Sequence, residues 1–304
     1  MLMSVTERLI QLKRIAVLTD LESDSDKVLS YAASMARWYG SELLIAHACA
    51  HDIYLPLPSE PLPSWPVTGL DPKQNALEKL KSLTTKLNLA DLTPKVMVHE
   101  GSVAGILKDL GEYHPNLLVL GTHGRDGIRK SLVGSVAEGV FRKVQWPVLM
   151  LGPGFSPTEA TPQKQFERVL YSTDLSGVSV TALQYAAGIS HDHEAQLIAL
   201  YVESDPEKGF SFDRPLAELR LQEWLQDRID GLADALAGVR RIIEFGKPEL
   251  KILEVAAGQQ ADLVVLGARG LGAASGFASH FLGGTAYEVV CSSKCPVLVV
   301  PQPN

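Results

Sequence analysis

The sequence predicts an α/β protein built from two tandem, doubly wound parallel sheets of five strands each. Three observations lead to this fold class: a length of 304 residues, short apolar runs alternating with amphipathic stretches, and segments that recur in order. A chain of this length has room for about two domains of ~150 residues. Short runs rich in β-branched residues are typical of strands covered on both faces, and their alternation with helices favours parallel sheets with right-handed crossovers.

The two halves of the chain repeat each other. The segment VLTDLESDSDKVLSYAA (17–33) matches LYSTDLSGVSVTALQYAA (170–187), and LLVLGTHG (117–124) matches LVVLGARG (263–270). Three further pairs occur in the same order: 41–48 with 195–202, 96–102 with 242–248, and 144–152 with 293–301. Matches that keep their order indicate duplication of one domain.

A segment rich in Pro, Gly, Ser and Thr, GPGFSPTEATPQKQ (152–165), separates the two copies. This composition is typical of a linker. We therefore expect one domain over residues 1–152, a linker over 153–164 and a second domain over 165–304.

In the first half, five short apolar runs are the expected strands: 15–18, 43–46, 96–98, 117–120 and 148–151. Between the first two runs, small and apolar residues recur at helical spacing: Leu29, Ala32, Ala33 and Ala36. Side chains between Ser23 and Asp26 offer N-caps for this helix. Its small residues predict close packing on the sheet.

The segment HDIYLPLPSEPLPSWPVTGLDP (51–72) interrupts this alternation with six prolines. Proline excludes both a helix interior and an inner strand. The segment is either a surface excursion or a lid or partner-binding loop, because long loops in compact domains are often functional.

Composition excludes several classes of protein. A net charge of −7 argues against nucleic-acid binding, and no apolar run approaches the length of a membrane span. The N-terminus has no secretory apolar core. Cys49, Cys291 and Cys295 match neither a disulfide framework nor a zinc site, so we expect inert thiols and a cytoplasmic protein.

A basic, glycine-spaced loop, GTHGRDGIRKSLVGS (121–135), follows the fourth expected strand. Ligands of open α/β sheets bind beyond the carboxyl ends of the strands. Glycines allow a ligand to approach the backbone closely, and Ser135 begins an amphipathic run whose helical N-terminus would attract anions. With the side chains of His123, Arg125, Arg129 and Lys130, the loop suits a polyphosphate. The alternative is that the glycines only form a turn.

The spacing Gly-x-x-Gly, nine residues, then Gly-Ser resembles the ATP-binding branch of the universal stress protein family, and the resemblance covers both halves. It implies the adenine nucleotide α-hydrolase-like fold and ATP or ADP as ligand, with Mg²⁺ as a further candidate. It also implies that Asp20 contacts the adenine side and that the backbone at Ala48 meets the base. An N-cap or Asx-turn is the structural alternative for Asp20. The loop residues expected to bind the nucleotide are Gly121, Gly124, Arg125, Gly134, Ser135 and Val136.

The second copy departs from this pattern. The expected equivalents of the first site are Asp174, Val202, Gly267, Gly270, Gly283, Gly284 and Thr285. Twelve residues instead of nine separate Gly270 from Gly283, Gly284 replaces the serine, and no Lys or Arg follows Arg269 until Lys294. We expect one nucleotide per chain, with a second site that is empty, structural or selective for another ligand.

Enzymatic motifs are absent from the sequence. The one Gly-Lys pair, Gly246-Lys247, precedes Pro248 where a phosphate-binding loop requires Ser or Thr, and no nucleophile elbow occurs. The triplet His191-Asp192-His193 is interpreted as a solvated turn, and no metal site is expected. With no nucleophile and base pair to propose, ATP hydrolysis would be slow at most.

Two classes of function remain. One is a nucleotide-binding regulatory protein of the stress response with an unidentified protein partner, and the other is an interaction or chaperone-like module whose loops are structural. Both halves end in an apolar Pro-Val-Leu run, Pro147–Leu149 and Pro296–Leu298. Since domains of the family that this chain resembles commonly pair along that edge, we expect an intramolecular pseudo-dimer, with a homodimer as a further option.

Overall fold

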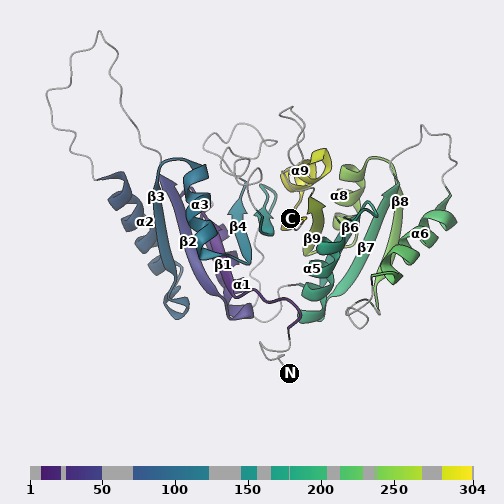
Figure 1. Ribbon diagram of the computed structural model, residues 1–304, viewed down its shortest axis with the longest axis horizontal. Coiled ribbons are helices and arrows are strands. Elements are labelled where there is room, and N and C mark those ends of the chain that lie inside the picture. The colour runs from purple at the N-terminus through teal and green to yellow at the C-terminus, as the bar shows by residue number, and fades with distance from the viewer. Residues whose placement is uncertain are drawn as a thin grey trace, which may run out of the picture.

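The fold is seen in a computed structural model of the chain (Figure 1), which describes residues 8–21, 25–49, 71–122, 145–155, 166–177, 179–203, 213–228, 236, 238–268 and 283–302. The expected α/β architecture is confirmed: strands and helices alternate through both halves. Most of the segment 51–72 lies outside the described residues, so neither interpretation of it is tested.

The first half follows the expected order of elements. These are β1 (Arg14–Leu18), α1 (Ser25–Tyr39), β2 (Glu42–Cys49), α2 (Pro72–Lys86), the 3-10 helix η2 (Ala90–Leu92), β3 (Lys95–Glu100), α3 (Val103–Tyr113), β4 (Leu117–Gly121) and β5 (Val148–Leu151). All five expected strands are confirmed, and β2 extends three residues beyond its apolar run. The apolar positions predicted for α1 are fully buried, as its small residues require.

The second half repeats these elements. They are β6 (Arg168–Thr173), α5 (Ser179–Asp192), β7 (Gln196–Glu203), α6 (Arg214–Gln226), β8 (Arg240–Phe245), α8 (Pro248–Gly258), β9 (Leu263–Ala268), α9 (Gly283–Ser292) and β10 (Val297–Pro301). The repeat read from the sequence is therefore also a repeat of structure.

One sequence match shifts by a residue in the structure. Gly101 and Gly246 directly follow β3 and β8, with φ values of +132° and +128°. Their N–H groups donate to the last carbonyls of the neighbouring strands, on Cys49 at 2.9 Å and on Glu203 at 3.1 Å. Segment 96–102 therefore corresponds to 241–247, and its alignment with 242–248 was wrong. Few non-glycine residues adopt such a φ, so this position identifies the repeat better than the apolar pattern does.

The two halves share one sheet. Its strand order is β3-β2-β1-β4-β5-β10-β9-β6-β7-β8, parallel within each half and antiparallel only between β5 and β10. Three register pairs join them: Val148 with Val299, Leu149 with Leu298, and Met150 with Val297. The expected packing through the last strands is thus confirmed, and the two five-stranded sheets form one sheet of ten strands.

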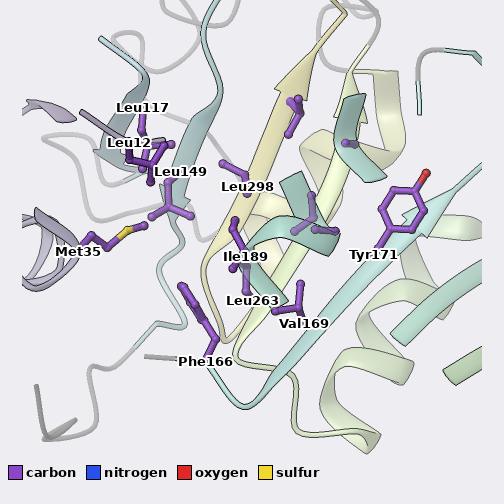
Figure 2. Close-up of a cluster of buried hydrophobic side chains, with 14 of the residues drawn as sticks. Leu12, Met35, Leu117, Leu149, Phe166, Val169, Tyr171, Ile189, Leu263 and Leu298 are labelled. Carbon is purple, nitrogen blue, oxygen red and sulfur yellow. The ribbon is translucent and has the colours of Figure 1, made fainter. Parts of the chain in front are cut away.

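The hydrophobic core continues across this seam. Figure 1 shows α1 and α5 on the face of the sheet near the N-terminus, with α3, α8 and α9 on the opposite face. On the first face, side chains from both halves meet in one cluster (Figure 2), including Met35, Leu149, Phe166, Ile189 and Leu298, each no more than 2% exposed. Each such buried side chain contributes roughly 1.5–3 kcal/mol relative to exposure in water.

Residues 8–12, which we call the N-terminal strap, bind the first half to α5 of the second. The backbone N–H groups of Leu9 and Ile10 donate to the two carboxylate oxygens of Asp192, at 2.7 and 3.0 Å. Ile10 also packs on Gly188, where a Cβ would come within 2.5 Å of the Ile10 side chain. The glycine therefore provides the space that the strap needs.

An aromatic cluster of Arg8, Trp38, Tyr39, Phe166 and His193 lies beside the strap. The His193 ring stacks on Trp38 with centroids 4.6 Å apart, and Phe166 meets His193 edge-on at 4.7 Å. A hydrogen bond of 3.1 Å joins the Tyr39 hydroxyl to His193 Nε2. Burial, with the nearby Asp192 carboxylate, raises the pKa of Tyr39 far above its usual value. The phenol therefore keeps its proton.

The interpretation of His191-Asp192-His193 as a solvated turn is wrong for two of its residues. Asp192 and His193 are 3% and 2% exposed. Both lie at the contact between the halves, where the strap and the aromatic cluster replace water as their partners. The sequence showed three polar residues at a helix end but not the distant segments that cover them.

We predict that Asp192→Ala weakens the association of the two halves. Two backbone N–H groups lose their acceptor, and the expected loss is about 2–4 kcal/mol in the free energy of unfolding. Urea denaturation measures this loss. Asp227→Ala, at an exposed position on the end of α6, is the control and is expected to change stability by less than about 0.5 kcal/mol. Equal effects of the two variants would contradict the role of Asp192.

We also predict that cutting the linker leaves the halves associated. A protease site placed within residues 156–165 breaks the covalent connection, while the β5–β10 pairing, the shared core and the strap all remain. Size-exclusion chromatography of the cleaved protein is expected to give one peak at the mass of the intact chain. Separation into two monomeric halves at micromolar concentration would contradict the arrangement.

Candidate functional site

The carboxyl ends of β1, β2 and β4 form the candidate site of the first half. The strand order β3-β2-β1-β4-β5 places a topological switch point between β1 and β4, the usual ligand position in open α/β sheets. Asp20 follows the end of β1, Ala48 lies near the end of β2, and Gly121 ends β4. The structure thus brings three of the predicted site residues to one edge.

A chain of hydrogen bonds shapes the turn after β1. Leu21 has a φ of +62°, which is uncommon for a residue with a side chain. Its N–H donates to Thr19 Oγ1 at 3.1 Å, Thr19 donates to Ser25 Oγ at 2.8 Å, and Ser25 donates to Asp20 Oδ1 at 3.3 Å. The Asp20 carboxylate is therefore tied to the first residue of α1.

The second half reproduces this turn. Leu175 has a φ of +61°, and its N–H donates to Thr173 Oγ1 at 2.9 Å. Asp174 Oδ1 accepts from the Ser176 N–H at 3.0 Å and from Ser179 Oγ at 2.7 Å. Burial alone would raise the pKa of Asp174, but the hydrogen bonds from the two serines outweigh it and lower the pKa. Asp174 therefore forms an Asx-turn, whereas the Asp20 carboxylate accepts from the Ser25 hydroxyl, and both aspartates are exposed at the carboxyl edge.

Gly121 has a packing role as well as its place at the edge. A Cβ at this position would lie 3.0 Å from Val28 Cγ2 of α1, which is tighter than most real contacts. The glycine therefore lets α1 approach β4. In the second half, Gly267 lies one residue before the end of β9 and pairs with Val300.

The remaining loop residues predicted for the first site, Gly124, Arg125, Gly134, Ser135 and Val136, lie outside the described residues, as does Gly270 of the second. In the second half, the described part of α9 spans Gly283–Ser292 and so contains the predicted site residues Gly283, Gly284 and Thr285. Among the residues that the structure describes, none has an atom within 4 Å of a Cβ built on Gly284, the position where the first half has Ser135.

The sequence analysis did not predict a role for two histidines near the carboxyl ends of the strands in the first half. His47 Nδ1 bonds to the carbonyl oxygen of Thr19 at 2.8 Å and so joins the ends of β1 and β2. His99, on β3, bonds through Nδ1 to Asp109 Oδ2 at 2.7 Å. The single signal available in the sequence was the position of both residues near strand ends.

Two findings bear on metals and membranes. Within the ranges that the structure describes, no group of three or more His, Cys, Asp or Glu side chains is placed to hold a metal ion. Among the helices in those ranges, none is long and apolar enough to cross a bilayer.

Comparisons with known proteins agree with the fold and the repeat. The sequence matches the universal stress protein family twice, over residues 11–152 and 165–301. It is 27% identical to a universal stress protein of Mycobacterium tuberculosis over 298 residues, which span 95% of this chain and 97% of that one. It is 34% identical to a universal stress protein of Thermus aquaticus over 140 residues, 44% of this chain and 98% of that one.

A solved structure agrees over nearly the full length. The crystal structure of a universal stress protein from Archaeoglobus fulgidus superposes with a TM-score of 0.69 at 24% identity, covering 97% of this chain and 99% of that one. At this identity the likeness establishes the fold. Together with the two family matches, it leads to one conclusion. The chain belongs to the universal stress protein family and carries two copies of its domain in tandem.

Proposed function

We propose that this protein is a stress-response regulator that binds ATP or ADP in its first domain, residues 1–152. The observation that carries the proposal is the convergence of Asp20, Ala48 and Gly121 on the switch point where the basic glycine loop begins. An exposed carboxylate at this edge can accept hydrogen bonds from an exocyclic amine. The backbone of β2 beside Ala48 offers a surface to a planar base.

The glycine loop would hold the phosphates. Gly124 and Gly134 allow the backbone to approach a phosphate closely. Ser135 and the amide of Val136 would bind it at a helix N-terminus, where the helix dipole favours anions. Arg125 adds a charge-assisted hydrogen bond. A magnesium ion would be held chiefly by the nucleotide's own phosphates.

The second domain, residues 165–304 after the linker 153–164, keeps the turn around Asp174 but lacks the cations of the first loop. We propose that it binds no nucleotide tightly, because Arg269 is the single Lys or Arg between Gly267 and Lys294. Its proposed contacts, if a less anionic ligand is bound, are Asp174, Val202, Gly267, Gly270, Gly283, Gly284 and Thr285.

A regulatory role fits these residues better than catalysis. The Asp20 carboxylate accepts from Ser25, and that of Asp174 accepts from Ser176 and Ser179. No nucleophile with an adjacent base can be named, so hydrolysis of ATP would be slow. Binding would instead order the loop and change the affinity for a protein partner. The alternative is a nucleotide-independent interaction module, which the packing of Gly121 on Val28 favours, since that contact explains the glycine without a ligand.

We predict that the double variant Gly124→Val, Gly134→Val folds and loses nucleotide. Two β-branched side chains would occupy the space that the phosphates need and disfavour left-handed backbone conformations. Isothermal titration calorimetry with ATP measures the loss, and circular dichroism verifies the fold. The matched control is Gly270→Val, Gly283→Val in the second domain, which is expected to keep wild-type affinity. Unchanged affinity in the first variant would refute the assignment.

We further predict one tight nucleotide site per chain. Each charge-assisted hydrogen bond to a phosphate contributes roughly 1.5–3 kcal/mol, so losing even one lowers affinity by about tenfold or more. Equilibrium titration with ATP, with and without Mg²⁺, is expected to give a stoichiometry of one. Two equivalent sites, or tight binding that survives Gly124→Val, would be incompatible with the proposed asymmetry.

A further inference from the structure

The imidazole of His99 lies in a notch on α3 that a glycine creates. A Cβ on Gly105 would come within 2.0 Å of His99 Nε2, so a larger residue there would displace the imidazole from its present position. Glycine in a helix interior costs roughly 0.5–1 kcal/mol relative to alanine. The stability of α3 is therefore reduced at the position where the His99 ring packs.

The ring is oriented along α3 with Nε2 toward the ligand edge. Nδ1 bonds to Asp109 at 2.7 Å, one turn further along the helix than Gly105. Nε2 lies by Gly105 and 3.4 Å from the position of a Cβ on Gly101, the residue that follows β3 at the carboxyl edge. Since α3 begins at that edge, Nε2 is the ring nitrogen that faces it. His99 is 25% exposed.

Asp109 also determines which nitrogen carries the proton. A carboxylate only accepts hydrogen bonds, so Nδ1 must be protonated to reach it. In the neutral imidazole Nε2 is then an acceptor, with a lone pair directed at the edge. Within the described part of the chain, no hydrogen bond to Nε2 is present.

His99 stands beside the residue proposed to meet the base. It pairs in register with Ala48 of β2, and neighbouring strands are roughly 4.8 Å apart. Ala48 lies on the face of the sheet that α3 covers, the face from which His99 contacts α3. We propose that His99 Nε2 accepts a hydrogen bond from the exocyclic amine of the purine and makes the first domain selective for adenine nucleotides. This inference rests on the proposed function.

The second domain lacks each part of this arrangement. Glu244 pairs with Val202 in the register where His99 pairs with Ala48. By the same correspondence Leu250, which is 52% exposed, stands in place of Gly105. Glu254, in place of Asp109, bonds instead to Lys251 at 2.7 Å. Among the described residues of the second domain, Glu244 therefore takes the place of the imidazole, in keeping with one adenine site per chain.

The test compares ATP with purine riboside triphosphate, which has the same phosphates and ring but no amine. We expect the wild-type chain to prefer ATP by about fivefold, the scale of one neutral hydrogen bond. His99→Phe keeps a planar ring on Gly105 without an acceptor. Because the Asp20 carboxylate can still accept from the amine, this variant is expected to lose most, but not all, of the preference for ATP. In Asp109→Asn the amide can pair with either tautomer, so the preference is expected to fall partway. Calorimetric titration of the full chain measures all of these affinities.

Controls separate this inference from the proposed function. Glu244→Gln, at the matched position of the second domain, is expected to leave the preference unchanged. If His99→Phe weakens both nucleotides equally, His99 only supports the fold and the inference is wrong while the proposed function stands. If His99→Phe does not fold, an unchanged preference in Asp109→Asn overturns the inference. If the wild-type chain binds neither nucleotide, both the proposed function and the proposed role of His99 are wrong.

Discussion

The antiparallel pairing of β5 with β10 is the constraint on which the rest of the structure depends. A five-stranded parallel sheet has two edges with unpaired backbone groups, and joining the last strands covers one edge of each half. Because the pairing is antiparallel, the halves are related by an approximate twofold axis, and α1 and α5 lie on the same face of the sheet. The core therefore continues across the seam on both faces of the sheet.

Three register pairs alone make a short seam, and other contacts extend it. The N-terminal strap reaches from the first half to Asp192, and the aromatic cluster packs His193 against Trp38 and Tyr39. Arg8 lies 5.3 and 5.2 Å from the centroids of those two rings of the first half. These contacts exclude water from a carboxylate and an imidazole, which explains how such polar groups are accommodated at the junction.

In the two halves, the backbone at the carboxyl ends of the strands has been preserved since the duplication, while the side chains there have changed. The turns at Leu21 and Leu175 have the same φ within one degree, because a threonine and a serine hydrogen-bond to each turn from within the same segment. The side chains that face α3 and α8 are under no such local requirement. Histidine in one half and Glu244 in the other are compatible with the same strand register. A tandem chain can thus keep one scaffold and carry two different sites.

The sequence by itself determined the duplication, all five strands of the first half and the buried face of α1. These features depend on residues that are close together in the sequence, so the local pattern of apolar and polar residues is enough to predict them. The spacing of apolar residues misaligned β3 with β8 by one residue, because adjacent apolar residues are compatible with two alignments. Tertiary structure alone decided the burial of Asp192, whose partner in the strap is 183 residues away, and the orientation of His99. Such contacts depend on which distant segments the sheet topology brings together, and no local pattern carries that information.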